Sequence, residues 1–155
     1  MAKLREADFY YGAVLSTLLN KGFRPALIEG GDDRQVYDFT TDDREFRMFI
    51  KYRSTPIDTK TEDYFSWQFI LTDNDLAEIN QYLQSGKEFS LGLVCGAESL
   101  KDSLYAVLRN DQIEQLLEQG KTNFTISIRK RERYFRIPIS GGRSEAIRVK
   151  ASDLY

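Results

Sequence analysis

A stripe of apolar side chains near the N-terminus is the first regular pattern in the chain. Its members recur at spacings of three and four residues: Leu4, Ala7, Tyr11, Val14, Leu15, Leu18 and Leu19. This spacing places them on one face of an α-helix, and a glycine just beyond it is typical of a helix C-terminus. The pattern predicts a helix over residues 3–21 that ends at Gly22 and buries the stripe.

Alternation of apolar and polar residues then predicts strands. Within residues 45–53 it separates a face with Phe46, Met48, Ile50 and Tyr52 from a face with Glu45, Arg47, Phe49, Lys51 and Arg53. Similar runs predict strands over 23–29, 35–40, 64–71, 89–95, 104–108, 123–129, 134–139 and 145–149. Residues 89–95 are apolar on both faces, which is typical of a central strand.

Two shorter helices are predicted from polar start signals. Thr72-Asp-Asn-Asp75 reads as a capping box that opens a helix to about Ser85, and Asp111-Gln-Ile-Glu114 opens a helix that ends at Gly120. A polar loop is expected over 54–63 and a turn over 140–142. The order predicts an α/β (α+β) fold, a mixed β-sheet flanked by helices, in a single domain over 1–155. We expect the first helix to pack on a sheet that contains 35–53, with strand 89–95 beside the first strand.

The composition excludes several classes of chemistry. The chain has no histidine and one cysteine, Cys95, so an internal disulfide, a Ser-His-Asp triad and a His-ligated zinc or haem are excluded. We interpret Cys95, which ends an apolar run, as a buried thiol. No run of about 18 apolar residues exists, and the charged start is not typical of a signal peptide, so a cytoplasmic location is expected.

Charge is distributed unevenly along the chain. The net charge is −2, yet residues 129–150 hold eight Lys/Arg and two acids, Glu132 and Glu145. Such a stretch indicates either a polyanion-binding surface or simply solvated strand faces and a hairpin tip. The hairpin tip between the predicted strands 123–129 and 134–139 carries Lys130, Arg131 and Arg133, which are candidate binding residues. A sequence pI of about 5.3 argues against strong non-specific DNA binding.

The order helix, three strands, helix, strand over residues 3–96 resembles the core of restriction-endonuclease-like, PD-(D/E)XK folds. Val36-Tyr37-Asp38-Phe39 supplies an aspartate on the second strand, and Met48-Phe49-Ile50-Lys51 supplies a lysine on the third. The resemblance implies that carboxylates at such positions hold Mg²⁺ while the lysine steadies the attacking water or the phosphate. It also implies a context of mobile elements and defence against them.

The family motif is broken at one position, because its acid would stand where this chain has Phe49. Glu29 at the end of the first strand is the candidate for a migrated acid, with Gln68 or Glu6 as further oxygen ligands. Glu45 shares the strand face of Lys51 but lies about 20 Å away along the strand. The competing interpretation is that Asp38 and Lys51 form a cross-strand ion pair, or contact a phosphate or partner without catalysis.

A basic strand face is the last candidate feature. Arg47, Lys51 and Arg53 share one face of a strand and would suit phosphate or carboxylate groups. The aromatics Phe65, Trp67 and Phe69 form a core face or, alternatively, a base-stacking platform. We therefore expect a non-catalytic protein that binds nucleic acid or another protein and needs no cofactor. The alternatives are a Mg²⁺-dependent nuclease that uses Asp38, Lys51 and Glu29, and a structural or oligomer-forming module.

Overall fold

The computed structural model describes residues 3–57, 63–120, 122–139 and 142–151, with the side chains of 142–145 not described. Parts of the predicted loop over 54–63 and of the predicted turn over 140–142 therefore lie outside the described residues. The elements follow one another as α1 (Glu6–Asn20), β1 (Arg24–Glu29), β2 (Gln35–Thr40), β3 (Glu45–Arg53), β4 (Tyr64–Ile70), α2 (Asp73–Gln84), β5 (Phe89–Cys95), β6 (Leu104–Leu108), α3 (Asn110–Glu118), β7 (Asn123–Arg129), β8 (Tyr134–Ile139) and β9 (Gly142–Lys150).

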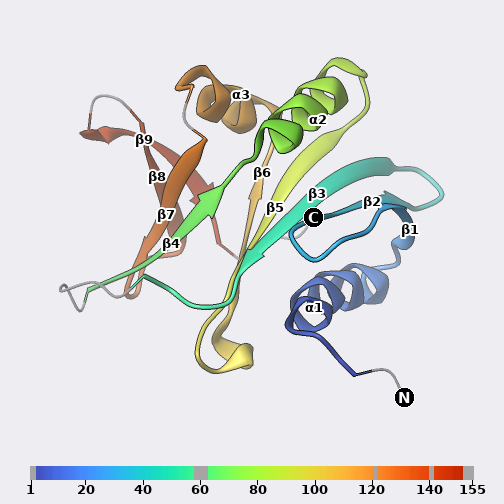
Figure 1. Ribbon diagram of the computed structural model, residues 1–155, viewed down its shortest axis with the longest axis horizontal. Coiled ribbons are helices and arrows are strands. Elements are labelled where there is room, and N and C mark those ends of the chain that lie inside the picture. The colour runs from blue at the N-terminus through green and yellow to red at the C-terminus, as the bar shows by residue number, and fades with distance from the viewer. Residues whose placement is uncertain (1–2, 58–62, 121, 140–141, 152–155) are drawn as a thin grey trace.

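These elements form an α+β fold with two sheets, which confirms the predicted mixture of helices and strands. The first sheet has the order β1-β2-β3-β5-β6, and the second has the order β4-β7-β8-β9. Figure 1 shows the two sheets side by side, with α1 beneath the first sheet and with α2 and α3 at the top. Among the described strands, only β3 and β5 pair in parallel, because the chain crosses over between them through β4 and α2.

The expected position of residues 89–95 is corrected in one respect. β5 lies inside the first sheet and is buried along its whole length, as its apolar faces predict. The neighbours of β5 are β3 and β6, however. β1 is an edge strand, and β2 and β3 lie between it and β5. Pro25 of β1 cannot donate a backbone hydrogen bond, and Leu27 and Ile28 are exposed, so β1 suits an edge better than the centre.

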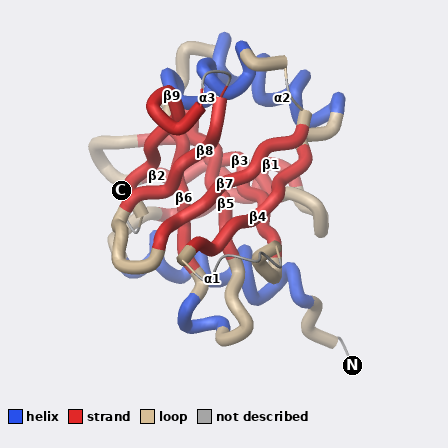
Figure 2. Tube along the Cα trace, turned by 90° about the vertical axis from the view of Figure 1, so that its left-hand side faces the viewer, coloured by secondary structure: helices blue, strands red, loops and turns tan. Residues whose placement is uncertain are grey.

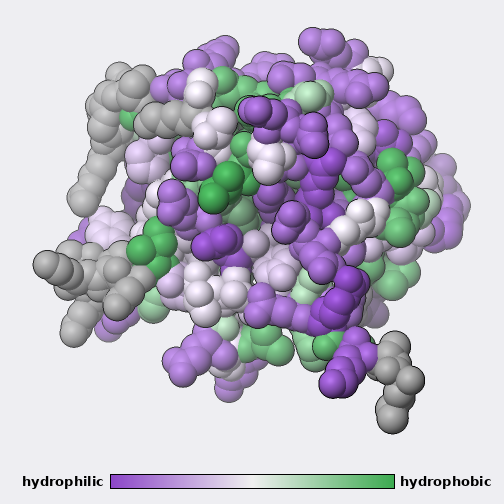
Figure 3. All heavy atoms as spheres, in the orientation of Figure 1, coloured by the Kyte–Doolittle hydropathy of each residue, from purple (hydrophilic) through white to green (hydrophobic). Residues whose placement is uncertain are grey.

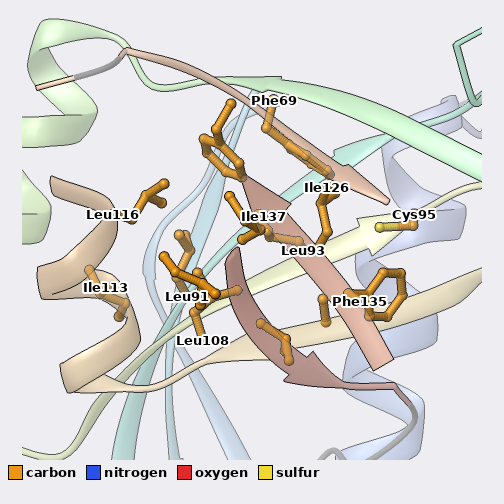
Figure 4. Close-up of a cluster of buried hydrophobic side chains, with 14 of the residues drawn as sticks. Phe69, Leu91, Leu93, Cys95, Leu108, Ile113, Leu116, Ile126, Phe135 and Ile137 are labelled. Carbon is orange, nitrogen blue, oxygen red and sulfur yellow. The ribbon is translucent and has the colours of Figure 1, made fainter. Parts of the chain in front are cut away.

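The first sheet has a hydrophobic cluster on each face, because β3 sorts its side chains by alternation. Phe46, Met48 and Ile50 pack toward α1, while Phe49 packs toward the second sheet, as predicted. Figure 4 shows the second cluster, where Phe69, Ile126 and Phe135 of the second sheet meet Leu91 and Leu93 of β5, with Ile113 and Leu116 of α3 at its side. The two sheets and the helices α2 and α3 thus share one apolar interior.

The ends of the predicted helices needed correction. α1 begins at Glu6, so Leu4 lies before the helix and is exposed, and Leu19 is also exposed. Tyr10, by contrast, is buried and stacks on Tyr52 with ring centroids 4.8 Å apart. Gly22 ends α1 with a φ of 92°, the left-handed conformation expected of a C-terminal glycine. Before α3, the backbone N–H of Arg109 donates to the Gln112 side chain at 2.9 Å, so Asp111 and Glu114 do not form the predicted capping box.

None of the helices within the described residues is long and apolar enough to cross a membrane.

Cys95 is fully buried at the end of β5, as predicted, and burial raises the pKa of its thiol well above the ordinary value. The thiolate is the reactive form of cysteine, so Cys95 should resist a disulfide reagent while the protein is folded. We expect slow labelling in buffer and fast labelling in denaturant, followed by absorbance of the released chromophore. Labelling at the rate of a free thiol in the folded protein would contradict this assignment.

Candidate functional site

A buried ion pair joins β3 to the first turn of α2. Strand alternation points Lys51 toward α2, and its Nζ lies 2.7 Å from Oδ2 of Asp75. Both side chains are buried, with Asp75 exposing 2% of its surface and Lys51 8%. The lysine at the position of the family motif therefore has a carboxylate partner, but that partner comes from α2 and not from the hairpin.

Arg34 brings three carboxylates together beside this pair. Its Nη1 donates to Oδ1 of Asp75 at 2.7 Å, and its Nη2 donates to Oε1 of Glu29 at 2.8 Å and to Oε1 of Glu78 at 2.7 Å. The guanidinium also lies 5.3 Å from the centroid of the Phe49 ring, within the range of a cation–π interaction. We call Glu29, Arg34, Lys51, Asp75 and Glu78 the Arg34–Lys51 network.

Asp75 has a second role as a helix cap. Its backbone N–H donates to Oγ1 of Thr72 at 3.1 Å, and its Oδ2 accepts from the Thr72 N–H at 2.9 Å, which confirms the predicted capping box. Burial by itself raises the pKa of Asp75, but hydrogen bonds from Lys51, from the Thr72 backbone and from Arg34 outweigh it and lower the pKa overall. Asp75 is therefore held as a carboxylate.

Glu78 differs from Asp75 in the direction of its pKa shift. Burial raises the pKa of Glu78, and a hydrogen bond with the neighbouring Glu29 carboxyl raises it further, against the attraction of Arg34. Its Oε2 atom is buried and has no hydrogen-bond partner among the described residues. Two carboxyl groups that share one guanidinium repel each other, so the Glu29 carboxyl opposes the ionisation of Glu78.

Asp38 forms a separate ion pair. Both of its carboxylate oxygens accept from Arg47, at 2.7 and 2.9 Å, and Arg47 lies 4.9 Å from the ring centroid of Tyr82. The β2–β3 register pairs Asp38 directly with Arg47, and Lys51 is four residues further along β3, about 13 Å away along the strand. The expected Asp38–Lys51 pair is thus wrong in its partner, although a cross-strand pair does form.

A polar cleft of about 700 Å³ opens beside Lys51 and Asp75. Its wall comes from the start of α1, the β1–β2 turn, the end of β3 and the start of α2, with Glu6, Asp32, Asp33, Arg53 and Asn74 among the lining residues. Carboxylates outnumber cations along this lining, and Arg5 binds the Asp32 side chain at 2.5 Å. The cleft therefore does not have the charge of a phosphate site.

Figure 3 shows a largely hydrophilic surface on one face of the molecule, with apolar side chains in small separate groups.

The structure brings together only some of the predicted site residues. Lys51 and Glu29 belong to the Arg34–Lys51 network, and Glu6 and Arg53 line the cleft. Gln68 is exposed on the second sheet, and Arg47 is occupied by Asp38. Lys130, Arg131 and Arg133 are exposed at the turn between β7 and β8, where Arg131 has a φ of 71°.

Arg34, Asp75 and Glu78 are the members of the network that sequence reasoning missed as site residues. The capping-box pattern placed Asp75 at a helix start, but it did not indicate which strand that helix end would face. Arg34 stands in a turn, where no periodicity marks its direction. Within the described ranges, no three His, Cys, Asp or Glu side chains are arranged to hold a metal ion.

No family model, no curated protein and no solved structure matches this chain.

Proposed function

We propose that this chain is a non-catalytic binding protein built on a core of the PD-(D/E)XK type, in which an ion-pair network replaces the metal site. Its partner is a nucleic acid or another protein. A cytoplasmic location and a role in the conflict between mobile elements and defence systems stay predictions from the sequence. Fold alone does not imply function, so the proposal depends on the side chains at the motif positions.

The arrangement of the N-terminal part supports the fold component of the proposal. The elements on which the resemblance was based, α1, β1, β2, β3, α2 and β5, are contiguous in space, because their four strands are neighbours in the first sheet. Helix α1 covers one face of that sheet, and α2 packs against the cluster on the other face. Strand β4 is the exception, since it leaves this unit and joins the second sheet.

The Arg34–Lys51 network is the observation that carries the proposal. At the position of the family's acid, Phe49 is fully buried, and its cross-strand partner on β2 is Val36, also fully buried. The carboxylates nearest to Lys51 are bound by cations that belong to the chain itself, since Arg34 contacts Glu29, Asp75 and Glu78. Mg²⁺ does not fit this set, because a guanidinium already occupies the point where the three carboxylates meet.

One observation favours the alternative of a Mg²⁺-dependent nuclease. Lys51 and Asp75 form an acid–lysine pair at the edge of the polar cleft, although the acid comes from α2 and the two groups bind each other. Glu29 is a weaker candidate for the migrated acid than the sequence suggested, because its carboxylate accepts a hydrogen bond from Arg34. The two functions differ in whether nucleic acid is cleaved when a divalent metal is added.

We expect no cleavage of single- or double-stranded DNA or RNA by the purified protein with Mg²⁺ or Mn²⁺. The physical reason is that the acid position of the motif on β3 is occupied by Phe49, the motif aspartate Asp38 is bound by Arg47, and the carboxylate beside Lys51 is neutralised by Arg34 and Lys51. The measurement is a gel assay of end-labelled substrates over several hours at protein concentrations above that of the substrate.

Three variants make the assay decisive. Lys51→Met removes the motif lysine, Asp38→Ala removes the motif aspartate, and Asp42→Ala removes a carboxylate that is 92% exposed in a turn and serves as the control. Metal-dependent cleavage that is retained in the Asp42 variant, and lost in a folded Lys51 or Asp38 variant, would overturn the proposal and establish the nuclease instead. Circular dichroism of each variant checks that it is folded.

A further inference from the structure

The outward face of the second sheet has a composition unlike the rest of the chain. Alternation buries Trp67, Phe69, Ile126, Phe135 and Ile147 against the core, so the residues between them face outward. We call these the outer face: Tyr64, Ser66, Gln68, Thr125, Ser127, Arg129, Tyr134, Arg136, Arg148 and Lys150. Figure 2 looks onto this sheet and shows helices above and below its strands, with none in front of them.

Strand register places the cations of the outer face beside one another. One row crosses all four strands through Ser66, Ser127, Arg136 and Arg148, and the Ser66 and Ser127 hydroxyls lie 2.7 Å apart. Like charges that stand directly opposite destabilise a sheet, as Arg136 and Arg148 do here. Arginine side chains gathered on one exposed face suit the binding of phosphate groups.

The acidic groups near the outer face do not balance these cations. The described side chains over 129–139 and 146–150 include seven cations, at 129, 130, 131, 133, 136, 148 and 150, against one acid, Glu132. Asp63, just before β4, is a further acid close to this region, since its backbone carbonyl accepts from the Lys130 N–H at 2.9 Å. A hydrogen bond from Arg136 lowers the pKa of Glu132, and the charges of Arg129 and Arg148 lower it further.

Aromatic rings accompany the cations. Tyr134 is 49% exposed, and the Arg129 guanidinium lies 5.7 Å from the ring centroid of Tyr64. Phe65, on the side of β4 that Trp67 also occupies, is 43% exposed and lies 5.8 Å from Nζ of Lys130. Unpaired bases stack on exposed aromatic rings and on arginine planes, while lysine and arginine bind the phosphates of the same strand. A duplex keeps its bases paired and an acidic protein has no bases to stack, so both make less use of these rings.

We propose that the outer face of the second sheet binds single-stranded nucleic acid, with phosphates on Arg129, Arg148 and Lys150 and a base stacked on Tyr134. This inference deepens the proposed function and rests on it only in that the partner is a nucleic acid. The binding surface lies on the second sheet, apart from the Arg34–Lys51 network, which faces α2 on the first sheet. Loss of one site can therefore be tested without changing the other.

The test uses fluorescence anisotropy with labelled oligothymidine or oligouridine of about 20 nucleotides in EDTA, at 50 and 200 mM salt. The face variant is Arg129→Gln/Arg148→Gln/Lys150→Gln. The matched control is Arg24→Gln/Lys87→Gln/Lys101→Gln, which removes the same charge from exposed positions elsewhere. We expect the face variant to raise Kd about tenfold or more and to make the log–log salt slope less negative by about 2 units, while the control changes Kd by less than about threefold.

A second variant tests the stacking component. Tyr134→Ala removes a half-exposed ring and no charge, so it should weaken oligothymidine binding but leave the binding of inorganic polyphosphate unchanged. The tip variant Lys130→Ala/Arg131→Ala/Arg133→Ala shows whether the sheet or only its turn is involved. Duplex bound more tightly than single strand, equal losses in the face and control variants, or a loss in the tip variant alone would each overturn the inference. Cleavage products in Mg²⁺ would instead contradict the proposed function and leave this inference standing.

Discussion

Replacing Asp75 with alanine is expected to lower the free energy of unfolding by about 3–5 kcal/mol, because it leaves the buried ammonium of Lys51 without its carboxylate. The same change removes one of the three carboxylates from Arg34 and the capping box at the start of α2. A cap alone is worth about 1 kcal/mol, so most of the loss should come from the buried charge. Urea unfolding, followed by circular dichroism, measures the difference.

Two variants separate the contributions of Asp75. Asp73→Ala removes an exposed carboxylate from the same first turn and should cost less than about 1 kcal/mol. Lys51→Met/Asp75→Leu replaces the ion pair with apolar side chains, and it should recover part of the loss of the single variant, because no unpaired charge remains buried. Asp75→Ala within about 1 kcal/mol of the unchanged protein would contradict the assignment of the network as a structural element.

The pH dependence of this loss follows from the lowered pKa of Asp75. The folded-state pKa lies below the unfolded value of about 3.9, so the stabilising contribution is fully present above that value. It is lost as the pH falls through the folded-state pKa. The stability difference between the unchanged protein and Asp75→Ala should therefore be constant near neutral pH and shrink at acidic pH.

The elements could be predicted from sequence because their signals are local. Alternation over 45–53 fixed both the strand and its two faces, and the bounds of β2, β3, β5, β6, β7 and β8 agree with the prediction. Turn residues such as Gly22 marked where a helix had to end. The partition of strands into two sheets was not predicted, because no local pattern shows that β4 leaves the first sheet to pair with β7.

The candidate site was predicted less well, because its contacts join distant positions. Lys51 and Asp75 are 24 residues apart, and Arg34 and Glu78 are 44 apart. The sequence marked Lys51 as the lysine two residues after the motif's acid position on the third strand and suggested Asp38 as its partner, but the register places Arg47 opposite Asp38. Arg47 and Lys51 are four residues apart on β3, and Asp38 pairs with Arg47 while Lys51 pairs with Asp75. A pattern of residue types alone does not determine these partners. Asp75 lies in α2, which belongs to the crossover between β3 and β5.

Gly96→Ala is expected to destabilise the protein by about 3 kcal/mol or more, because the new methyl group would meet backbone atoms that cannot move aside. A Cβ at this position would lie 2.5 Å from the carbonyl oxygen of Ser54 and 2.7 Å from that of Arg53. The Gly96 N–H donates to the Arg53 carbonyl at 2.7 Å, and the Gly96 carbonyl accepts from Nε1 of Trp67 at 2.8 Å. Gly96 thus fixes the end of β5 against β3 and connects both to the second sheet.

Two other glycines in the chain serve as controls for this prediction. At Gly92 the nearest atom to a new Cβ is Sδ of Met48 at 2.9 Å, and a flexible side chain can adjust, so Gly92→Ala should cost less than Gly96→Ala. At Gly12 in α1 no atom lies within 4 Å of a new Cβ, and alanine favours the helix, so Gly12→Ala should stabilise the protein by about 0.5–1 kcal/mol. Thermal and urea unfolding of the three variants give the order directly. A Gly96→Ala protein as stable as Gly92→Ala would show that β3 and β5 can separate at this point, and that the contact with Trp67 does not hold the two sheets together.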